Sequence, residues 1–202
     1  MMETIEQHLA FRKQRAEAYS TCFGDFETGY NGAPATNQSP RIDVFVYPPG
    51  PGNRPFYTLI TNGMSDRRMN TPASSPSRPR AEIVLYAKSP KKEYLDWIYW
   101  TAQFPFIDNT YLDITHRIPW HEPLFSGSTL SSMLMLDTLV RSDRQIEDTL
   151  FVESDPVRLL WWVPISLAEY ELSRTSGLSA LLDLFERFKH PVEIDEYRRS
   201  YV

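Results

Sequence analysis

Histidines and carboxylates lie close together in one short part of the chain. Asp113 precedes the segment THRIPWHEPL, and His116, His121 and Glu122 lie within it. Imidazole and carboxylate groups together can bind a divalent metal ion or transfer protons, so one hypothesis is a metal-dependent hydrolase that uses these four residues. Metal sites usually show tighter spacing, however, and His116 is expected on the same strand face as Leu112, Ile114 and Ile118, which favours a hydrogen-bonded core histidine. For His121, in a turn bounded by prolines, a structural hydrogen bond is favoured over catalysis.

No other segment carries a recognisable catalytic signature. The only cysteine, Cys22, lies in a turn-rich stretch and is interpreted as a small apolar residue. The sequence contains no Walker loop, GxGxxG, HExxH, CxxC or GxSxG pattern. We therefore expect a protein that is not an enzyme, with no catalytic residues, no bound metal and no cofactor, and keep the hydrolase as the alternative.

Arginines gather in the loop expected at residues 62–80, at Arg67, Arg68, Arg78 and Arg80. Such a loop could meet a phosphate or an acidic partner, and binding would then depend on salt. The favoured interpretation is a solvated loop whose arginines pair with acids elsewhere. The chain has a net charge of −5, which opposes binding to nucleic acid or to anionic lipid, so we expect neither as a partner.

The elements that must position these residues follow from hydrophobic periodicity. Helical spacing of Ile5, Leu9, Ala16 and Tyr19 predicts a helix over residues 3–20. Alternation predicts strands at residues 41–47 and 112–118. β-branched and aromatic residues predict another at 56–61, and further strands are expected at 81–86 and near 132–137, 148–152 and 157–163.

Three further helices are expected. One begins after Ser89 and is stopped by Pro105, and a capping box of Ser166 and Glu169 begins a short helix that Gly177 separates from the last one.

These elements predict the fold class α/β, of the mixed α+β kind, in a single domain with a mixed sheet layered with about four helices. Residues 1–40 are expected to form an N-terminal helix and loop packed on the domain, residues 41–189 the domain itself, and residues 190–202 a C-terminal tail. The longest apolar run, LLWWVPI, is too short to cross a membrane and predicts a buried strand. The first twenty residues show no signal-peptide pattern, so a cytoplasmic protein is expected.

The run IDVFVYPPGPGNRPFYTLITNGMSDRRMNTP, followed by RAEIVLY, resembles the suppressor-of-fused domain family. Its most distinctive residues are Gly63, Met64, Ser65, Arg80 and Glu82. Farther on, IPWHEPLFSGSTLSSMLMLD and WWVPISLAEYEL are similar to later parts of the family pattern, so the resemblance covers residues 40–189. It supports a single α/β domain.

The resemblance implies a non-catalytic protein-binding domain. Animal members grip a transcription-factor peptide as an added β-strand between this domain and a second one, and this chain ends at Val202 without that second domain. Shorter bacterial members resemble cytoplasmic proteins, some set beside toxins as proposed immunity proteins. The expected partner is therefore a protein, either a toxin to be neutralised or a peptide added to a sheet edge.

The resemblance also indicates where a partner would bind. The strand from Met133 to Asp137 matches the one that holds the peptide in animal members, so the candidate partner-binding residues are Met133, Met135, Asp137, Trp120, His121, Asp66, Arg67 and Arg68. The alternatives are an ordinary core strand and a structural GMSD loop, with Gly63 at a positive φ and Asp66 as a capping carboxylate. The five tryptophans fit either core or interface, and the sequence does not separate these uses.

Overall fold

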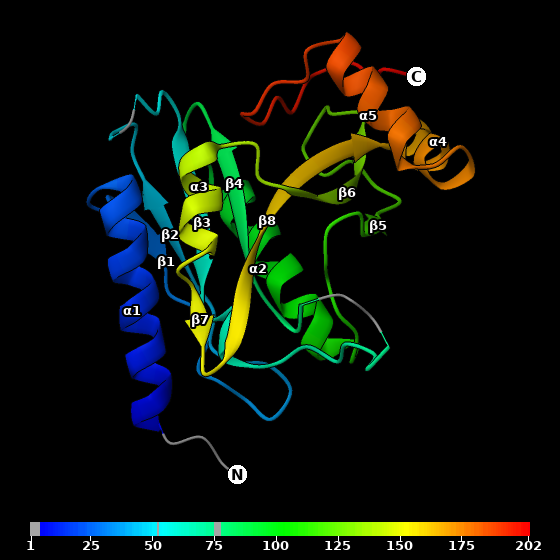
Figure 1. Ribbon diagram of the computed structural model, residues 1–202. Helices are drawn as coiled ribbons and strands as arrows, with labels where there is room; N and C mark the ends of the chain where they lie inside the picture. The colour runs from blue at the N-terminus through cyan, green and yellow to red at the C-terminus, as the bar shows by residue number, and fades with distance from the viewer. Residues whose placement is uncertain (1–4, 52, 75–77) are drawn as a thin grey trace.

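Eight strands form one sheet in the computed structural model, which describes residues 5–51, 53–74 and 78–202, with side chains from residue 9 onward (Figure 1). The strands are β1 (Thr28–Tyr30), β2 (Asp43–Tyr47), β3 (Tyr57–Asn62), β4 (Arg80–Ala87), β5 (Arg117–Pro119), β6 (Leu130–Asp137), β7 (Phe151–Val152) and β8 (Asp155–Ser166). Their order is β1-β2-β3-β4-β8-β6-β5, and β7 pairs with β8 outside this path. Only the β4–β8 pair is parallel, so the sheet is mixed as predicted.

Helices cover both faces of the sheet. They are α1 (Ile5–Phe23), α2 (Lys92–Ile107), α3 (Arg141–Glu147), α4 (Leu167–Thr175) and α5 (Leu178–Arg187), with a short 3-10 helix, η1 (Met64–Asp66). In Figure 1, α1 and α3 lie in front of the sheet and α2 lies behind it, while α4 and α5 extend from the end of β8. No helix of the described residues is both long and apolar enough to span a membrane.

Each face of the sheet has its own core. Inward-facing residues alternate along the strands, so that Trp162 of β8 packs with Met133 and Met135 toward α2, whereas Trp161 and Leu134 pack toward α1 and α3. Because β8 is buried on both faces, it reads in the sequence as one continuous apolar run. The buried strand predicted from that run is confirmed.

Helix α1 faces the sheet with only part of the side predicted from the sequence. Leu9 is 61% exposed, while Arg15, Tyr19 and Phe23 are buried at intervals of four residues. The apolar stripe predicted from the sequence is therefore buried only in part, because Tyr19 lies in the core while Leu9 is exposed. The buried side also includes an arginine, which hydropathy assigns to solvent.

Two further local predictions are wrong. Residues 112–116 are not a strand, because Thr115 has a φ of 76° and the chain turns there, so that β5 covers only Arg117–Pro119. Pro105 does not stop α2, which continues to Ile107. The proline ring is buried, and it removes one backbone hydrogen bond near the end of the helix.

The C-terminal helices follow the sequence closely. Ser166 and Glu169 form the predicted capping box, and Gly177, at a φ of 90°, separates α4 from α5. The segment after α5 is packed on the domain, since the backbone N–H of Ile194 donates to Tyr86 and the buried Arg198 donates to both carboxylate oxygens of Glu169.

Candidate functional site

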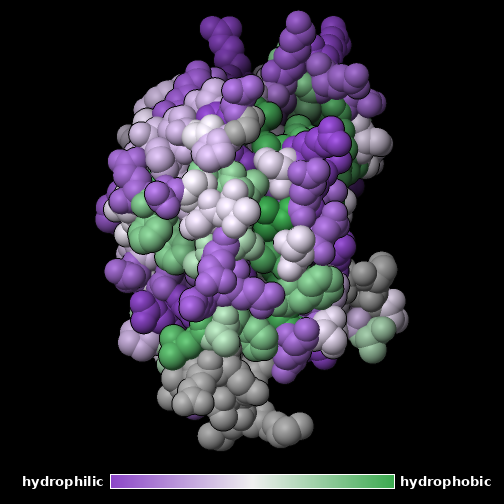
Figure 2. Space-filling model, turned by 60° about the vertical axis from the view of Figure 1, so that its left-hand side comes forward, coloured by the Kyte–Doolittle hydropathy of each residue, from purple (hydrophilic) through white to green (hydrophobic). Residues whose placement is uncertain are grey.

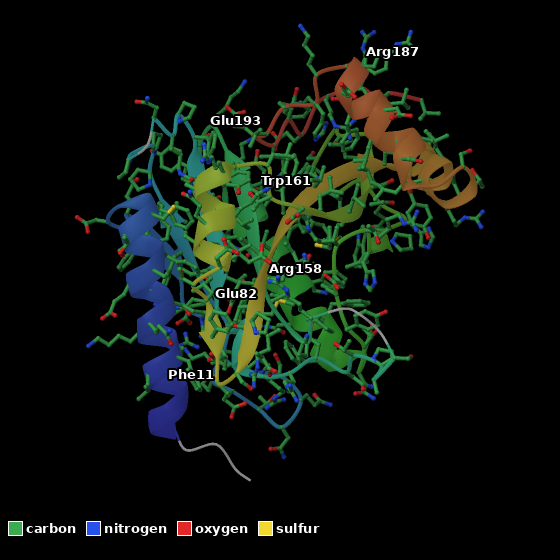
Figure 3. All side chains as sticks on the ribbon, viewed as in Figure 1. Phe11, Glu82, Arg158, Trp161, Arg187 and Glu193 are labelled. Carbon is green, nitrogen blue, oxygen red and sulfur yellow. The ribbon has the colours of Figure 1, made fainter. Side chains whose placement is uncertain are left out.

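The residues that carry the family resemblance surround one buried carboxylate. Glu82 of β4 is 0% exposed, and its Oε1 accepts hydrogen bonds from the backbone N–H groups of Gly63 and Ser65, each at 3.0 Å. The Ser65 hydroxyl donates to the same oxygen at 2.6 Å, and the Thr61 hydroxyl donates to Oε2 at 2.6 Å. Figure 3 shows Glu82 inside the molecule, in contrast to Arg187 at the outer end of α5. The GMSD loop is therefore wrapped around this carboxylate.

Gly63 is required at its position in that loop. Its φ is 130°, and a Cβ there would lie 2.2 Å from the backbone oxygen of Arg41. The predicted positive φ of Gly63 is confirmed.

Helix α1 is joined to the same cluster by charge. Arg15 donates to the Asn62 side chain at 2.8 Å, pairs with Asp66 and lies 3.3 Å from Glu82. Arg80 donates to the backbone oxygens of Ser65 and Asp66. Burial raises the pKa of Asp66 above its ordinary value, although Arg15 acts in the opposite direction. Asp66 is 4% exposed, so it contributes to this buried network and presents little surface to a partner.

The arginines of the loop that follows contact groups of the chain itself. Arg67 donates to the backbone oxygens of Thr36 and Asn37. Arg68 and Arg80 both donate to Asp155, at 2.6 and 2.9 Å. Arg78 pairs with Glu147 at 2.5 Å. These contacts agree with the interpretation of arginines paired elsewhere; Ser75, Pro76 and Ser77 of the loop lie outside the described residues.

The four residues of the hydrolase alternative do not converge. Asp113 is buried and lies 3.2 Å from Arg158, and its Oδ1 accepts the backbone N–H of Ile114. His116 is half-buried against the Tyr111 ring, outside any strand, whereas His121 and Glu122 are exposed. Within the described part of the chain, no group of three or more His, Cys, Asp or Glu side chains is placed to hold a metal ion.

The strand proposed to hold a peptide lies one position inside the sheet edge. Strand β5 pairs with β6 over Ser132–Leu134, and the backbone groups of Met135 bond with Thr115 and His116. The Met133 and Met135 side chains are fully buried, and Asp137 is half-buried. An added strand at β6 would therefore require β5 to move.

Three tryptophans form a surface cluster on the α2 side, which we call the tryptophan surface. Trp97 and Trp100 come from α2, and Trp120 follows β5. Trp120 contacts the other two rings edge to face, at centroid distances of 5.4 and 5.2 Å, and the Trp97–Trp100 distance is 6.2 Å. The Trp97 indole N–H donates to the backbone oxygen of Leu124 at 2.7 Å, which fixes the loop after β5 against α2. All three rings are half-buried, and His121 lies exposed beside them in sequence.

The side that carries α1 also exposes hydrophobic residues. Figure 2 shows green areas across the middle of that face, bordered by hydrophilic residues. Exposed large hydrophobic residues of α1, of β1 and of the segment between them include Leu9, Phe26 and Tyr30, and Phe26 stacks on Phe45 at 5.3 Å. This part of the chain contains no tryptophan.

Comparison with known families gives a match to the description "Suppressor of fused protein (SUFU)" over residues 38–200. This chain belongs to the suppressor of fused family. The comparison with curated proteins finds no match. Among solved structures, a SUFU homologue from Neisseria gonorrhoeae aligns with a TM-score of 0.72 at 13% identity, covering 96% of this chain and 98% of that one.

Two further suppressor of fused structures share the fold. A structure titled as the Sufu-Fu complex aligns with a TM-score of 0.62 at 13% identity, covering 96% of this chain and 92% of that one. Drosophila Suppressor of Fused aligns with a TM-score of 0.61 at 16% identity, covering 94% of this chain but 50% of the Drosophila chain. The resemblance stated from the sequence is confirmed, and so is the mixed α/β fold.

Sequence reasoning did not find two features of the site. Arg15 was missed because a helical arginine is ordinarily assigned to solvent. Trp97 and Trp100 were noted only as aromatic residues, although a spacing of three on a helix places them on one face. That spacing was the available signal, but nothing in the sequence brought Trp120 to the same place.

Proposed function

We propose that this suppressor of fused domain is non-catalytic and binds a protein partner through the tryptophan surface. The observation that carries the proposal is the exposure of parts of three tryptophan rings in one cluster. Tryptophan is enriched among the residues that dominate binding energy at interfaces. A ring that is half-buried within its own chain is already held in place, so a partner would lose little side-chain entropy in covering it.

The family supports binding over catalysis. One structure with the same fold is titled as a complex between Sufu and Fu, which are two proteins. The candidate catalytic residues of this chain are dispersed, with Asp113 held by Arg158 and His121 exposed in a loop. A binding role needs a surface and no reacting group.

The surface incorporates part of the partner site proposed from the sequence. Trp120 belongs to it and the exposed His121 follows Trp120 in the chain, while Asp66, Arg67 and Arg68 lie in the buried network or contact other parts of the chain. Pairing of a peptide with β6 stays a proposal of its own, and it predicts that β5 detaches from Met133 when the peptide binds. Exposed tryptophan rings are available without that rearrangement.

A toxin is the partner that the family resemblance favours, and we propose neutralisation of a toxin in the cytoplasm as the specific form of this function. Such a role requires tight binding, and an aromatic cluster at the centre of an interface is suited to it. A regulatory protein partner would use the same surface.

The proposal can be tested with the wild-type chain and two variants of it. Trp100→Ala and Trp120→Ala together remove two rings of the cluster, while Phe26→Ala removes an exposed aromatic ring next to β1 as a matched control. The wild-type chain is used to capture partners from the native host, and the captured protein is purified for titration calorimetry.

We expect the double variant to bind that protein at least about 30-fold more weakly, and Phe26→Ala to bind it like the wild type. Equal binding by the double variant would refute the tryptophan surface. A catalytic turnover that His121→Ala abolishes would refute the non-catalytic role.

A further inference from the structure

We infer that the tryptophan surface selects a partner that presents an arginine or lysine side chain to it. This inference rests on the proposed function and adds the chemistry of the partner. It starts from the carboxylates placed around the three rings and from the cations that the chain places elsewhere.

Helix α2 sets two carboxylates next to the tryptophans. Glu93 precedes Trp97 by four residues, and Asp96 precedes Trp100 by four residues. Side chains four residues apart lie on the same face of a helix, so each ring has an acid one turn before it. Both acids are exposed.

A third carboxylate comes from the loop after β5. Glu122 is exposed two residues after Trp120, in the loop that the Trp97–Leu124 hydrogen bond holds against α2. Acids from two separate parts of the chain therefore border the same aromatic cluster.

These carboxylates remain available for a partner. Among the residues with described side chains, Glu93 and Glu122 make no ion pair or hydrogen bond. Asp96 pairs only with Lys92, at 2.6 Å, and both side chains are exposed. An exposed pair of this kind contributes little and exchanges readily.

The chain stacks its own cations on other rings. Arg54 lies 4.6 Å from the centre of the Phe23 ring, and Arg198 lies 4.5 Å from that of Tyr201. No described cation lies over Trp97, Trp100 or Trp120, although tryptophan is the strongest aromatic partner for a cation.

Arg117 is directed away from this surface. Its side chain donates a hydrogen bond to the backbone oxygen of Ser173 in α4. In the β5–β6 pair Arg117 lies opposite Leu134, whose side chain packs in the core on the face of the sheet away from α2. Ile118, the next residue, packs in the core beneath α2, and alternation puts Trp120 on the same side as Ile118.

The geometry favours stacking on an open face over enclosure in a cage. The three rings touch one another edge to face, so no cation fits between them. An arginine or lysine would lie on the exposed part of a ring with its charge toward Glu93, Asp96 or Glu122. The net charge of −5 also attracts a cationic partner as it approaches.

The test uses short capped peptides as probes and the isotope-labelled full chain as receptor. Four peptides share the frame Gly-Xaa-Gly-Xaa-Gly, where Xaa is arginine, lysine, leucine or glutamate. Binding is followed by the indole N–H signals in nuclear magnetic resonance spectra, in which the five tryptophans are separate reporters.

We expect the arginine and lysine peptides to shift the signals of Trp97, Trp100 and Trp120 and to leave the buried Trp161 and Trp162 unchanged. Raising the salt concentration from about 0.05 M to about 0.5 M should weaken this binding about threefold or more, because the exposed charges are then screened. The double variant Glu93→Gln and Glu122→Gln should weaken it by about the same factor. A matched control, Asp183→Asn and Glu186→Gln on the exposed side of α5, should bind like the wild type.

Stronger binding of the leucine or glutamate peptide would overturn the inference, as would arginine binding that neither salt nor the glutamine variants weaken. These failures differ from failure of the proposed function. If the Trp100→Ala and Trp120→Ala variant no longer binds the captured partner but the Glu93→Gln and Glu122→Gln variant binds it like the wild type, binding by the tryptophan surface is supported. The inference of a cationic partner is then refuted. If the Trp100→Ala and Trp120→Ala variant still binds the captured partner like the wild type, the proposed function of the tryptophan surface is refuted.

Discussion

The segment from Gly63 to Glu82 and the tryptophan surface differ in what their distinctive residues do. The first carries the sequence pattern of the family, and its side chains Ser65, Asp66 and Arg80 are buried in the network that surrounds the Glu82 carboxylate. Of the second, only Trp120 lies in a segment that is similar to the family pattern, and its three aromatic rings are half-buried. In this chain, the residues most useful for recognising the family build the scaffold, while a less distinctive set forms the surface that we propose binds a partner.

The physical reason is the cost of burying charge. A buried carboxylate needs nearly all of its acceptor positions filled, so the identities of its neighbours are tightly constrained. Glu82 needs the Gly63 turn, the Ser65 hydroxyl and the Thr61 hydroxyl at the same time. A partly exposed aromatic cluster has no such requirement, because water can hydrogen-bond with any polar group that the chain leaves without a partner.

The largest expected effect in this comparison is that of Glu82→Gln. The amide cannot accept every hydrogen bond that the carboxylate accepts, and the nearby Arg15 would lose a buried counter-charge. We expect the free energy of unfolding to fall by about 3–5 kcal/mol, measured by urea denaturation. Glu186→Gln on the exposed side of α5 is the control, and it should change stability by less than about 0.5 kcal/mol. Similar stabilities for the two variants would mean that the hydrogen bonds to Glu82 do not stabilise the fold.

Much of the fold could be predicted from period and capping alone. Alternation located β2, and β-branched and aromatic content located β3. The long apolar run located β8, because strands packed on both faces need apolar residues on both sides. The same reasoning failed at residues 112–116, where the apolar alternation continues through a turn at Thr115. Leu112 is buried there by loop packing, which produces the same pattern as a strand.

The site was less predictable because it is assembled from distant parts of the chain. The tryptophan surface depends on the hydrogen bond from Trp97 to Leu124, which joins α2 to the loop after β5. The network around Glu82 depends on Arg15, which lies more than sixty residues earlier in the sequence. Local patterns give the period of an element but not the identity of its distant contacts.

The pH dependence of stability gives a second test of how a buried polar group differs from an exposed one, and the group that carries it is His190. This ring stacks on Phe185 at 4.0 Å, its Nδ1 lies 3.1 Å from the Tyr201 hydroxyl, and the charged groups facing it are Arg198 and Glu169. Burial, followed by the charge of Arg198, lowers the pKa of His190 from 6.5 to about 4. Because the unfolded chain then binds the proton more readily than the folded chain, stability from this group is complete above about pH 6.5 and is lost as pH falls toward about 4.

We expect wild-type stability relative to His190→Phe to fall by about 2–3 kcal/mol between pH 7 and pH 4.5, at about 1.4 kcal/mol per pH unit. The phenyl ring can keep the stacking on Phe185 but does not titrate. Urea denaturation of both proteins across this pH range isolates the histidine, since the other titrating groups are common to the two chains. Parallel pH profiles would show that His190 accepts its proton equally well in the folded and unfolded chains.

A smaller effect on stability is expected at the tryptophan surface. Trp100→Ala removes edge-to-face contacts with Trp97 and Trp120 from a ring that is only half-buried, and should lower the free energy of unfolding by about 1–2 kcal/mol. Trp162→Ala is the matched comparison, because Trp162 is buried and donates to the Thr101 hydroxyl at 3.1 Å. It should lower stability by about 3–5 kcal/mol. Thermal and urea unfolding measure both, and equal losses would mean that Trp100 belongs to the core as much as Trp162 does.

The smallest effect is expected at the border of the buried network, at Arg68. Its side chain is 61% exposed, and its partner Asp155 also accepts a hydrogen bond from the buried Arg80. Removing Arg68 therefore leaves Asp155 with a cation, and exposed ion pairs contribute little, so Arg68→Gln should cost about 0.5 kcal/mol or less. That small cost should vanish at about 1 M salt, where surface charges are screened within about 3 Å.

Asp155→Asn, which weakens the contacts of both arginines, should cost more at either salt concentration, because Arg80 is buried and depends on hydrogen bonds that salt does not screen. If Arg68→Gln lowered stability as much as Asp155→Asn, the structural network around Glu82 would extend to the exposed loop, and exposed residues would be as important to the scaffold as buried ones.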